Sequence, residues 1–97
     1  MKITGTVLRN SFSQFLGFRF SLNKSKILIF DLKKEKKVLV DMFYVFFPLD
    51  IIFLDEGKKV IEIRHAQPFS FVIPKNKVRY IVEGQLENIN LNDVMEF

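Results

Sequence analysis

The sequence contains no cysteine, no tryptophan and only one histidine among its 97 residues. A chain without cysteine has no disulfide framework, no thiolate zinc site and no cysteine nucleophile. The lone His65 follows an expected strand, and we interpret it as a surface or loop-packing residue. Because no histidines are paired and no metal-ligating residues cluster, we predict no metal site and no cofactor. The four glycines are isolated from one another, which excludes a glycine-rich phosphate loop.

Length and composition indicate one globular domain that spans residues 1–97. Apolar residues make up 48% of the chain and charged residues 27%, which is typical of a soluble protein. The opening stretch, MKITGTVLRN, lacks the apolar segment that follows the positive charge in a secretory signal. Together with the missing cysteines, this predicts a cytoplasmic protein.

The net charge of +4 is distributed unevenly along the chain. Residues 83–97 contain four acidic residues and no basic one, so every lysine and arginine precedes them. Basic proteins can attract nucleic acid, and one hypothesis is weak nucleic-acid binding through lysine-rich turns. We favour a role in solubility and edge-strand protection, because these lysines lack interleaved aromatic residues that stack on bases. The lysines concerned are Lys33–Lys37 (sequence KKEKK), Lys58, Lys59, Lys75 and Lys77.

Short apolar stretches separated by turn residues predict a mostly-β domain. We expect one hairpin from residues 27–32 and 38–47, and a second from residues 49–64 with its turn at residues 55–58. Further strands are expected at 2–9, 69–73, 77–84 and 90–97, with short helices at 11–17 (or an aromatic loop there) and 85–89. The missing strand–helix–strand rhythm predicts either a β-sandwich or a small barrel.

The stretch VLVDMFYVFFPLDIIFL, residues 38–54, is apolar at nearly every position. Its 17 residues are at the short limit for a membrane-spanning helix, and Asp41, Pro48 and Asp50 interrupt it. We therefore predict no membrane span but two strands joined at a bend near Pro48. Both faces of residues 42–47 are apolar, which predicts a central strand covered on both sides or an aromatic face for a partner or ligand.

PLDIIFLDEGKKVIEI, residues 48–63, resembles the core motif of a widespread family, domain of unknown function 192. GFRFSL at 17–22, ILIFDL at 27–32 and VRYIVEGQLENINLNDVMEF at 78–97 resemble other segments of the family in the same order. The resemblance implies a compact β-sandwich of the jelly-roll type and implies no activity. Where the family has a polar Met-Lys-Asn-Thr, this chain has Met42-Phe43-Tyr44-Val45, which indicates a divergent member.

These observations lead to the hypothesis of a non-catalytic binding module that binds another protein, a second copy or an apolar ligand through the aromatic residues at 42–47. We identify no catalytic residues, and the candidate binding residues are Met42, Phe43, Tyr44, Phe46 and Asp50. The alternative hypothesis is an enzyme in which Asp50 and a basic partner act on a small anionic or sugar substrate. A buried Asp50 needs a hydrogen-bond donor, which we expect from Arg19, Arg64 or backbone N–H groups.

Overall fold

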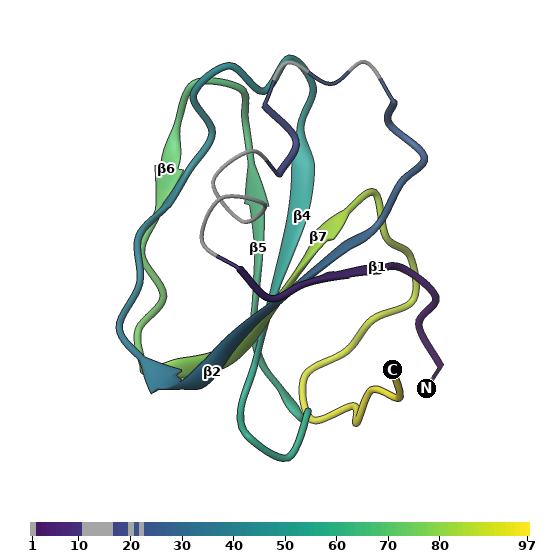
Figure 1. Cartoon of the computed structure of the whole chain (residues 1–97), viewed down its shortest axis with the longest axis vertical. Coiled ribbons are helices and arrows are strands. Elements are labelled where there is room, and N and C mark those ends of the chain that lie inside the picture. Colours follow the sequence, from purple (N-terminus) through teal and green to yellow (C-terminus); the bar gives the residue numbers. More distant parts are fainter. Residues whose placement is uncertain (1, 11–16, 20, 22) are drawn as a thin grey trace.

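The structure is a computed structural model that describes residues 2–10, 17–19, 21 and 23–97. Over these residues the chain forms seven strands and no helix. The strands are β1 (Thr6–Leu8), β2 (Leu28–Lys36), β3 (Val40–Asp41), β4 (Leu49–Leu54), β5 (Val60–Ala66), β6 (Phe71–Val72) and β7 (Val78–Gly84). Five of them form one sheet in the order β1-β2-β7-β4-β5, whereas β3 pairs with β6 in a second sheet (Figure 1).

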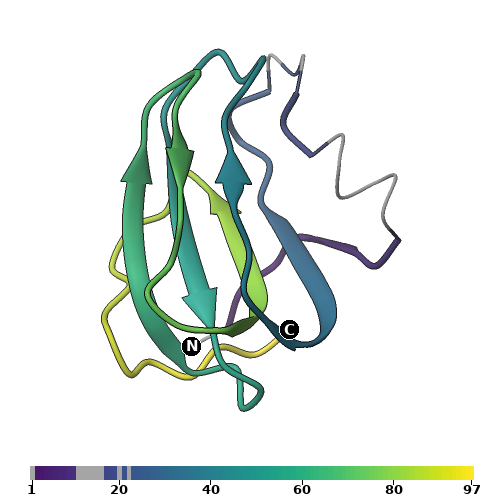
Figure 2. The same cartoon turned by 90° about the vertical axis from the view of Figure 1, so that its left-hand side faces the viewer.

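The large sheet is covered on both of its faces. On one face β3 and β6 lie side by side against it (Figure 2), and Phe30, Phe53 and Ile81 pack there with Val40 and Val72. On the other face the two terminal segments cover the sheet, with Met95 in the second core and Ile3 and Phe97 packed against it. Because side chains alternate along a strand, β2, β4 and β7 each contribute to both cores. The second core consists of Ile29, Ile52, Leu54, Val60, Val82 and Met95.

The predicted β-sandwich is confirmed, and the barrel alternative is wrong because the large sheet is open at β1 and β5. The second hairpin is also confirmed, since β4 and β5 pair in antiparallel fashion from Leu49↔Ala66 to Leu54↔Val60. Its turn is closed by Asp55, whose Oδ1 atom accepts hydrogen bonds from the N–H groups of Gly57 and Lys59 at 2.9 and 3.0 Å. The strands predicted at 2–9, 69–73 and 77–84 are present as β1, β6 and β7.

The first predicted hairpin is wrong, because β2 does not pair with residues 38–47. It lies parallel to β1 and antiparallel to β7, while β3 crosses to the second sheet and pairs with β6. The physical reason lies in the first half of β2, where Leu28, Ile29 and Phe30 are buried in succession. A strand with two apolar faces requires an interior position in the sheet. In that position β2 has β1 and β7 as its two neighbours, so neither of its edges is left to pair with residues 38–47.

The C-terminal expectations are also corrected. Residues 85–89 do not form the predicted helix, because the N–H of Leu86 donates to Asp50 and Asn88 takes a left-handed φ of 60°. Instead of a strand, residues 90–97 form single bridges, Val94 to Lys59 and Glu96 to Lys2. The helix predicted at 11–17 lies, except for its last residue, outside the described residues. No helix in the described part of the chain is long and apolar enough to cross a membrane.

Candidate functional site

Residues 42–47 form a loop rather than the predicted central strand. Residues 43 and 44 make a turn, in which the N–H of Val45 donates to the carbonyl of Met42 at 3.2 Å. This turn shifts the alternation of the chain, so Met42, Val45 and Phe47 point into the core. The interpretation of a strand covered on both sides is therefore wrong. Phe43, Tyr44 and Phe46 are each about half exposed, at 52%, 52% and 49%.

A second loop, residues 67–70, holds the first one in place. The N–H of Met42 donates to the carbonyl of Ser70 at 2.7 Å, and the N–H of Phe69 donates to the carbonyl of Met42 at 2.9 Å. These bonds bring the half-exposed ring of Phe69 to 6.0 Å from that of Tyr44 and to 6.1 Å from that of Phe46. We call Phe43, Tyr44, Phe46 and Phe69 the aromatic surface. Sequence reasoning missed Phe69, because it lies more than twenty residues further along the chain.

Two of the four residues in the aromatic surface have an unusual backbone. Tyr44 and Phe69 both take a φ of 61°, in the left-handed region. This conformation costs a residue with a Cβ atom roughly 1–2 kcal/mol. Such positions persist where the surrounding structure holds them, and they cluster at functional sites. Here neither strained residue gains the burial that a core position would provide.

Asp50 lies on β4 directly opposite His65 of β5, at the edge of a shallow groove. Its Oδ2 atom accepts a hydrogen bond from the N–H of Leu86 at 2.8 Å, and its Oδ1 atom contacts Nδ1 of His65. The backbone N–H donor that we predicted for Asp50 is thus present. The predicted arginine donors are replaced by the side chain of His65, which is 77% exposed. The arrangement places an acid beside a base on an open surface. The other groove-lining residues are Pro48, Leu49, Gln67, Gln85 and Glu87.

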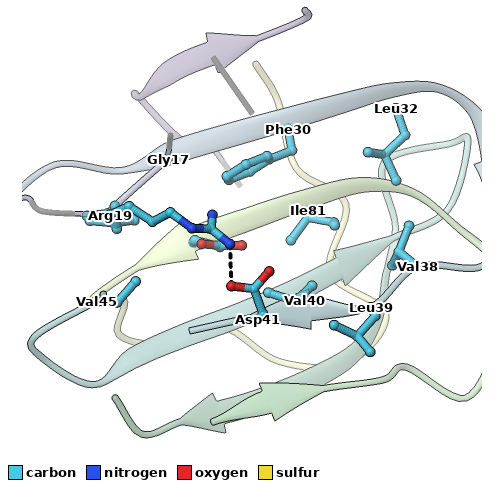
Figure 3. Close-up of a pocket in the computed structure, with 12 residues that line it drawn as sticks. Gly17, Arg19, Phe30, Leu32, Val38, Leu39, Val40, Asp41, Val45 and Ile81 are labelled. Carbon is cyan, nitrogen blue, oxygen red and sulfur yellow. Dashed lines mark hydrogen bonds and ion pairs between the residues drawn. The ribbon is translucent and has the colours of Figure 1, made fainter. Parts of the chain in front are cut away.

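A second polar site lies at one open edge of the sandwich and was not predicted. It is a pocket of about 280 Å³ between the large sheet, β3 and the turn at residues 17–19. Arg19 and Asp41 point toward one another across its mouth and form an ion pair (Figure 3). Phe18 fixes this turn, because its ring is buried and packs edge-on against that of Phe47 at 5.7 Å. The apolar walls are formed by Phe30, Leu32, Val38, Leu39, Val40, Val45 and Ile81.

Glu83 of β7 also lines this pocket, and its side chain is only 7% exposed. Its strand neighbours at the same level are apolar, Leu28 on β2 and Ile51 on β4. Burial raises the pKa of Glu83 to about 7, with Arg19 acting to lower the pKa and Asp41 acting to raise it. The Glu83 carboxyl therefore titrates in the neutral pH range rather than in the acidic range usual for glutamate.

The remaining predicted residues form no further cluster. Within the described ranges no group of three or more acidic or histidine side chains is placed to hold a metal ion. Among the lysines considered for nucleic acid, Lys58 donates from Nζ to the carbonyl of Phe97 at 2.8 Å, and Nζ lies 4.3 Å from the centre of that ring. The ammonium group of Lys58 is thus bound to the C-terminal segment.

The geometry defines a class of small two-sheet β domain with an aromatic surface at one end and an apolar pocket that contains a buried acid. The sequence profile of domain of unknown function 192, described as "Uncharacterized ACR", matches residues 3–95, and the chain belongs to this family. A UPF0127 protein of Thermococcus sibiricus is 32% identical over 84 residues, which cover 81% of this chain and 54% of that protein. A UPF0127 protein of Pyrococcus furiosus is 34% identical over 77 residues, covering 77% of this chain and 66% of the relative.

The fold also occurs among solved structures. A crystal structure of a protein of unknown function from Novosphingobium aromaticivorans matches with a TM-score of 0.72 at 24% identity. The match covers 81% of this chain and 60% of the other. This chain therefore spans little more than half the length of the first of these relatives and three fifths of that structure. The family is described as uncharacterised, so membership assigns no activity to this chain.

Proposed function

We propose that this chain is a non-catalytic binding domain that contacts a partner protein through its aromatic surface. The observation that supports the proposal is the mutual contact of Tyr44 and Phe69, two half-exposed rings on separate loops, both held in a left-handed backbone conformation. Contiguous exposed apolar groups often mark interaction sites, and aromatic residues are enriched at the centres of protein interfaces. The proposal also accounts for aromatic residues where the family motif has polar ones.

A protein fits this surface better than a small ligand does. None of the four rings lines the pocket at Glu83 or the groove at Asp50, and each ring is about half exposed, as side chains on an open face are. We infer a different protein rather than a second copy, because two copies with a net charge of +4 each repel one another. The same charge favours a partner whose apolar contact region has an acidic surrounding.

The test removes the rings without disturbing the backbone. Asparagine tolerates the left-handed region, so the double variant Tyr44→Asn/Phe69→Asn loses both rings while keeping both turns. Lys33→Asn is the matched control, because Lys33 also has a positive φ, of 69°, and lies on β2 away from the aromatic surface. Partners captured from a host lysate with the wild-type chain are purified, and their affinity for each variant is measured by calorimetry.

We expect the double variant to lose at least tenfold in affinity for the purified partner and Lys33→Asn to bind it like the wild type. Equal affinity for all three chains would refute the role of the aromatic surface. Light scattering measures whether the wild-type chain forms a dimer. A dimer that is lost in the double variant would show that a second copy, rather than a different protein, covers the aromatic surface.

A second candidate function is supported by the contact between Asp50 and His65. An acid beside a histidine in an open groove is the geometry that the enzymatic hypothesis requires, and it satisfies the reach criterion for proton transfer. Acid–base chemistry on a small anionic or sugar substrate therefore stays a prediction. Nucleic-acid binding through the lysine-rich turns and a cytoplasmic location also stay predictions.

A further inference from the structure

The carboxyl group of Glu83 is buried in a pocket without a partner. Glu83 is only 7% exposed to solvent. Within the described part of the chain, no hydrogen bond involves its side chain. Every fully enclosed polar side-chain atom in the described residues has a hydrogen-bond partner. Because the Glu83 oxygens have no such partner, they are not fully enclosed and must be open to the pocket that Glu83 lines. A carboxyl group in this position is costly to bury unless something donates to it.

Among the charged groups around the pocket, Glu83 is the one without an ion pair in the described part of the chain. Arg19 is ion-paired with Asp41 across the mouth, so these two charges largely cancel (Figure 3). The neighbours of Glu83 on β2 and β4, Leu28 and Ile51, carry no charge. When Glu83 is ionised, the charges of Arg19, Asp41 and Glu83 together give the polar end of the pocket a net charge of about −1.

We propose that this pocket binds a small molecule that carries a protonated amine on an apolar body, with the amine at Glu83. The amine donates hydrogen bonds to the carboxylate and neutralises its charge. The apolar body lies against Phe30, Leu32 and Ile81, which form the wall beside Glu83. A volume of about 280 Å³ is near the lower limit for a ligand pocket, so the ligand is small.

The chemistry discriminates against other ligand classes. A carboxylate ligand would place a second negative charge near Glu83 and Asp41, and Arg19 is already engaged by Asp41. A neutral alcohol could donate a hydrogen bond to Glu83 but would leave its charge without compensation. An amine meets both requirements. This site is separate from the aromatic surface, so failure of either proposal leaves the other intact.

The experiment compares three ligands that share one apolar body: 2-phenylethylamine, 2-phenylethanol and 3-phenylpropanoate. Their affinities for the whole chain are measured at pH 8 by NMR titration. We expect the amine to bind at least tenfold more tightly than the alcohol and the carboxylate more weakly than either. Equal binding of the three, or no binding of the amine at millimolar concentration, would overturn the proposal.

Two further measurements locate the effect at Glu83. Glu83→Gln keeps the shape of the side chain but removes its charge, and we expect it to lose the preference for the amine. Glu96→Gln removes the same charge from an exposed side chain and should bind the amine like the wild type. An amine preference that survives in Glu83→Gln would refute the assignment.

The wild-type chain provides a test that does not depend on folding of the variant. The ionised fraction of a group with a pKa of about 7 rises from roughly one tenth at pH 6 to roughly nine tenths at pH 8. Amine affinity should therefore rise about tenfold over this range, because phenylethylamine stays protonated throughout. The charged groups that face Glu83 are Arg19 from the turn at 17–19 and Asp41 from β3. A flat pH profile would contradict the proposal.

Discussion

Tyr44 and Phe69 lie in different loops, share a left-handed φ of 61° and meet ring to ring at 6.0 Å. Two backbone hydrogen bonds between Met42 and the second loop fix this arrangement, since Met42 donates to Ser70 and accepts from Phe69. The loops thus hold two strained residues so that their rings form one surface. Strain without burial is the feature that separates these residues from the core aromatics.

This relationship predicts that Tyr44→Asn and Phe69→Asn leave the domain folded. Asparagine should recover about 1 kcal/mol of left-handed strain, which offsets the roughly 0.5–1.5 kcal/mol of the lost ring contact. We therefore expect each variant to have a free energy of unfolding within about 1 kcal/mol of the wild type, measured by urea denaturation. A loss of several kcal/mol would show that these rings belong to the core.

A comparison of two neighbouring residues tests which side of residues 42–47 faces outward. Phe43 is about half exposed, so Phe43→Asp should fold and lose less than about 1 kcal/mol. Met42 is fully buried, and Met42→Ala should cost about 2–5 kcal/mol through the cavity it leaves. Thermal unfolding of both variants checks this prediction. Similar destabilisation by the two substitutions would contradict the exposed position of Phe43.

Part of this fold could be predicted from the sequence because it depends on local pattern. The apolar run from Leu49 to Leu54, the turn at Asp55 and the second run to Ala66 define the β4–β5 hairpin. The first hairpin failed because the same local pattern did not determine which strand is the neighbour of β2. That choice depends on β7, which lies about fifty residues further along the chain.

The sites were harder to predict than the strands. Strict alternation along residues 42–47 predicts that Met42 and Tyr44 lie on the same face of a strand. The turn at residues 43 and 44 instead buries Met42 in the core and leaves Tyr44 on the surface. Glu83 gave no signal because an acid on an alternating strand normally faces solvent. Its burial requires that both faces of β7 be covered, and its surroundings include Arg19 and Asp41 from distant segments.

Substitutions at Asp50 should separate its structural role from its contact with His65. Asp50→Ala removes the acceptor for the N–H of Leu86, and an unpaired backbone donor costs about 1–3 kcal/mol. Asp50→Asn keeps an acceptor, and His65→Ala removes only an exposed partner, so we expect each to cost less than about 1 kcal/mol. Urea denaturation of the three variants checks this order.

The same variants test the enzymatic alternative. We expect no turnover of chromogenic phosphate esters or glycosides by the wild-type chain above the background of Asp50→Asn. Turnover that Asp50→Asn and His65→Ala both abolish, while folding is unchanged, would establish Asp50 as a catalytic residue and refute the non-catalytic proposal.

The buried carboxyl of Glu83 predicts a specific dependence of stability on pH. Its pKa is about 7 in the folded chain and 4.5 in its ordinary state, so the folded chain holds a proton that the unfolded chain releases between these values. Stability should therefore fall as the pH rises from 4.5 to 7 and stay low above it, with a total loss of about 3 kcal/mol. Glu83→Gln should remove this loss and be more stable than the wild type at pH 8. Denaturation of both chains at pH 5, 6, 7 and 8 measures the difference, and parallel pH profiles would show that Glu83 is not buried as an acid.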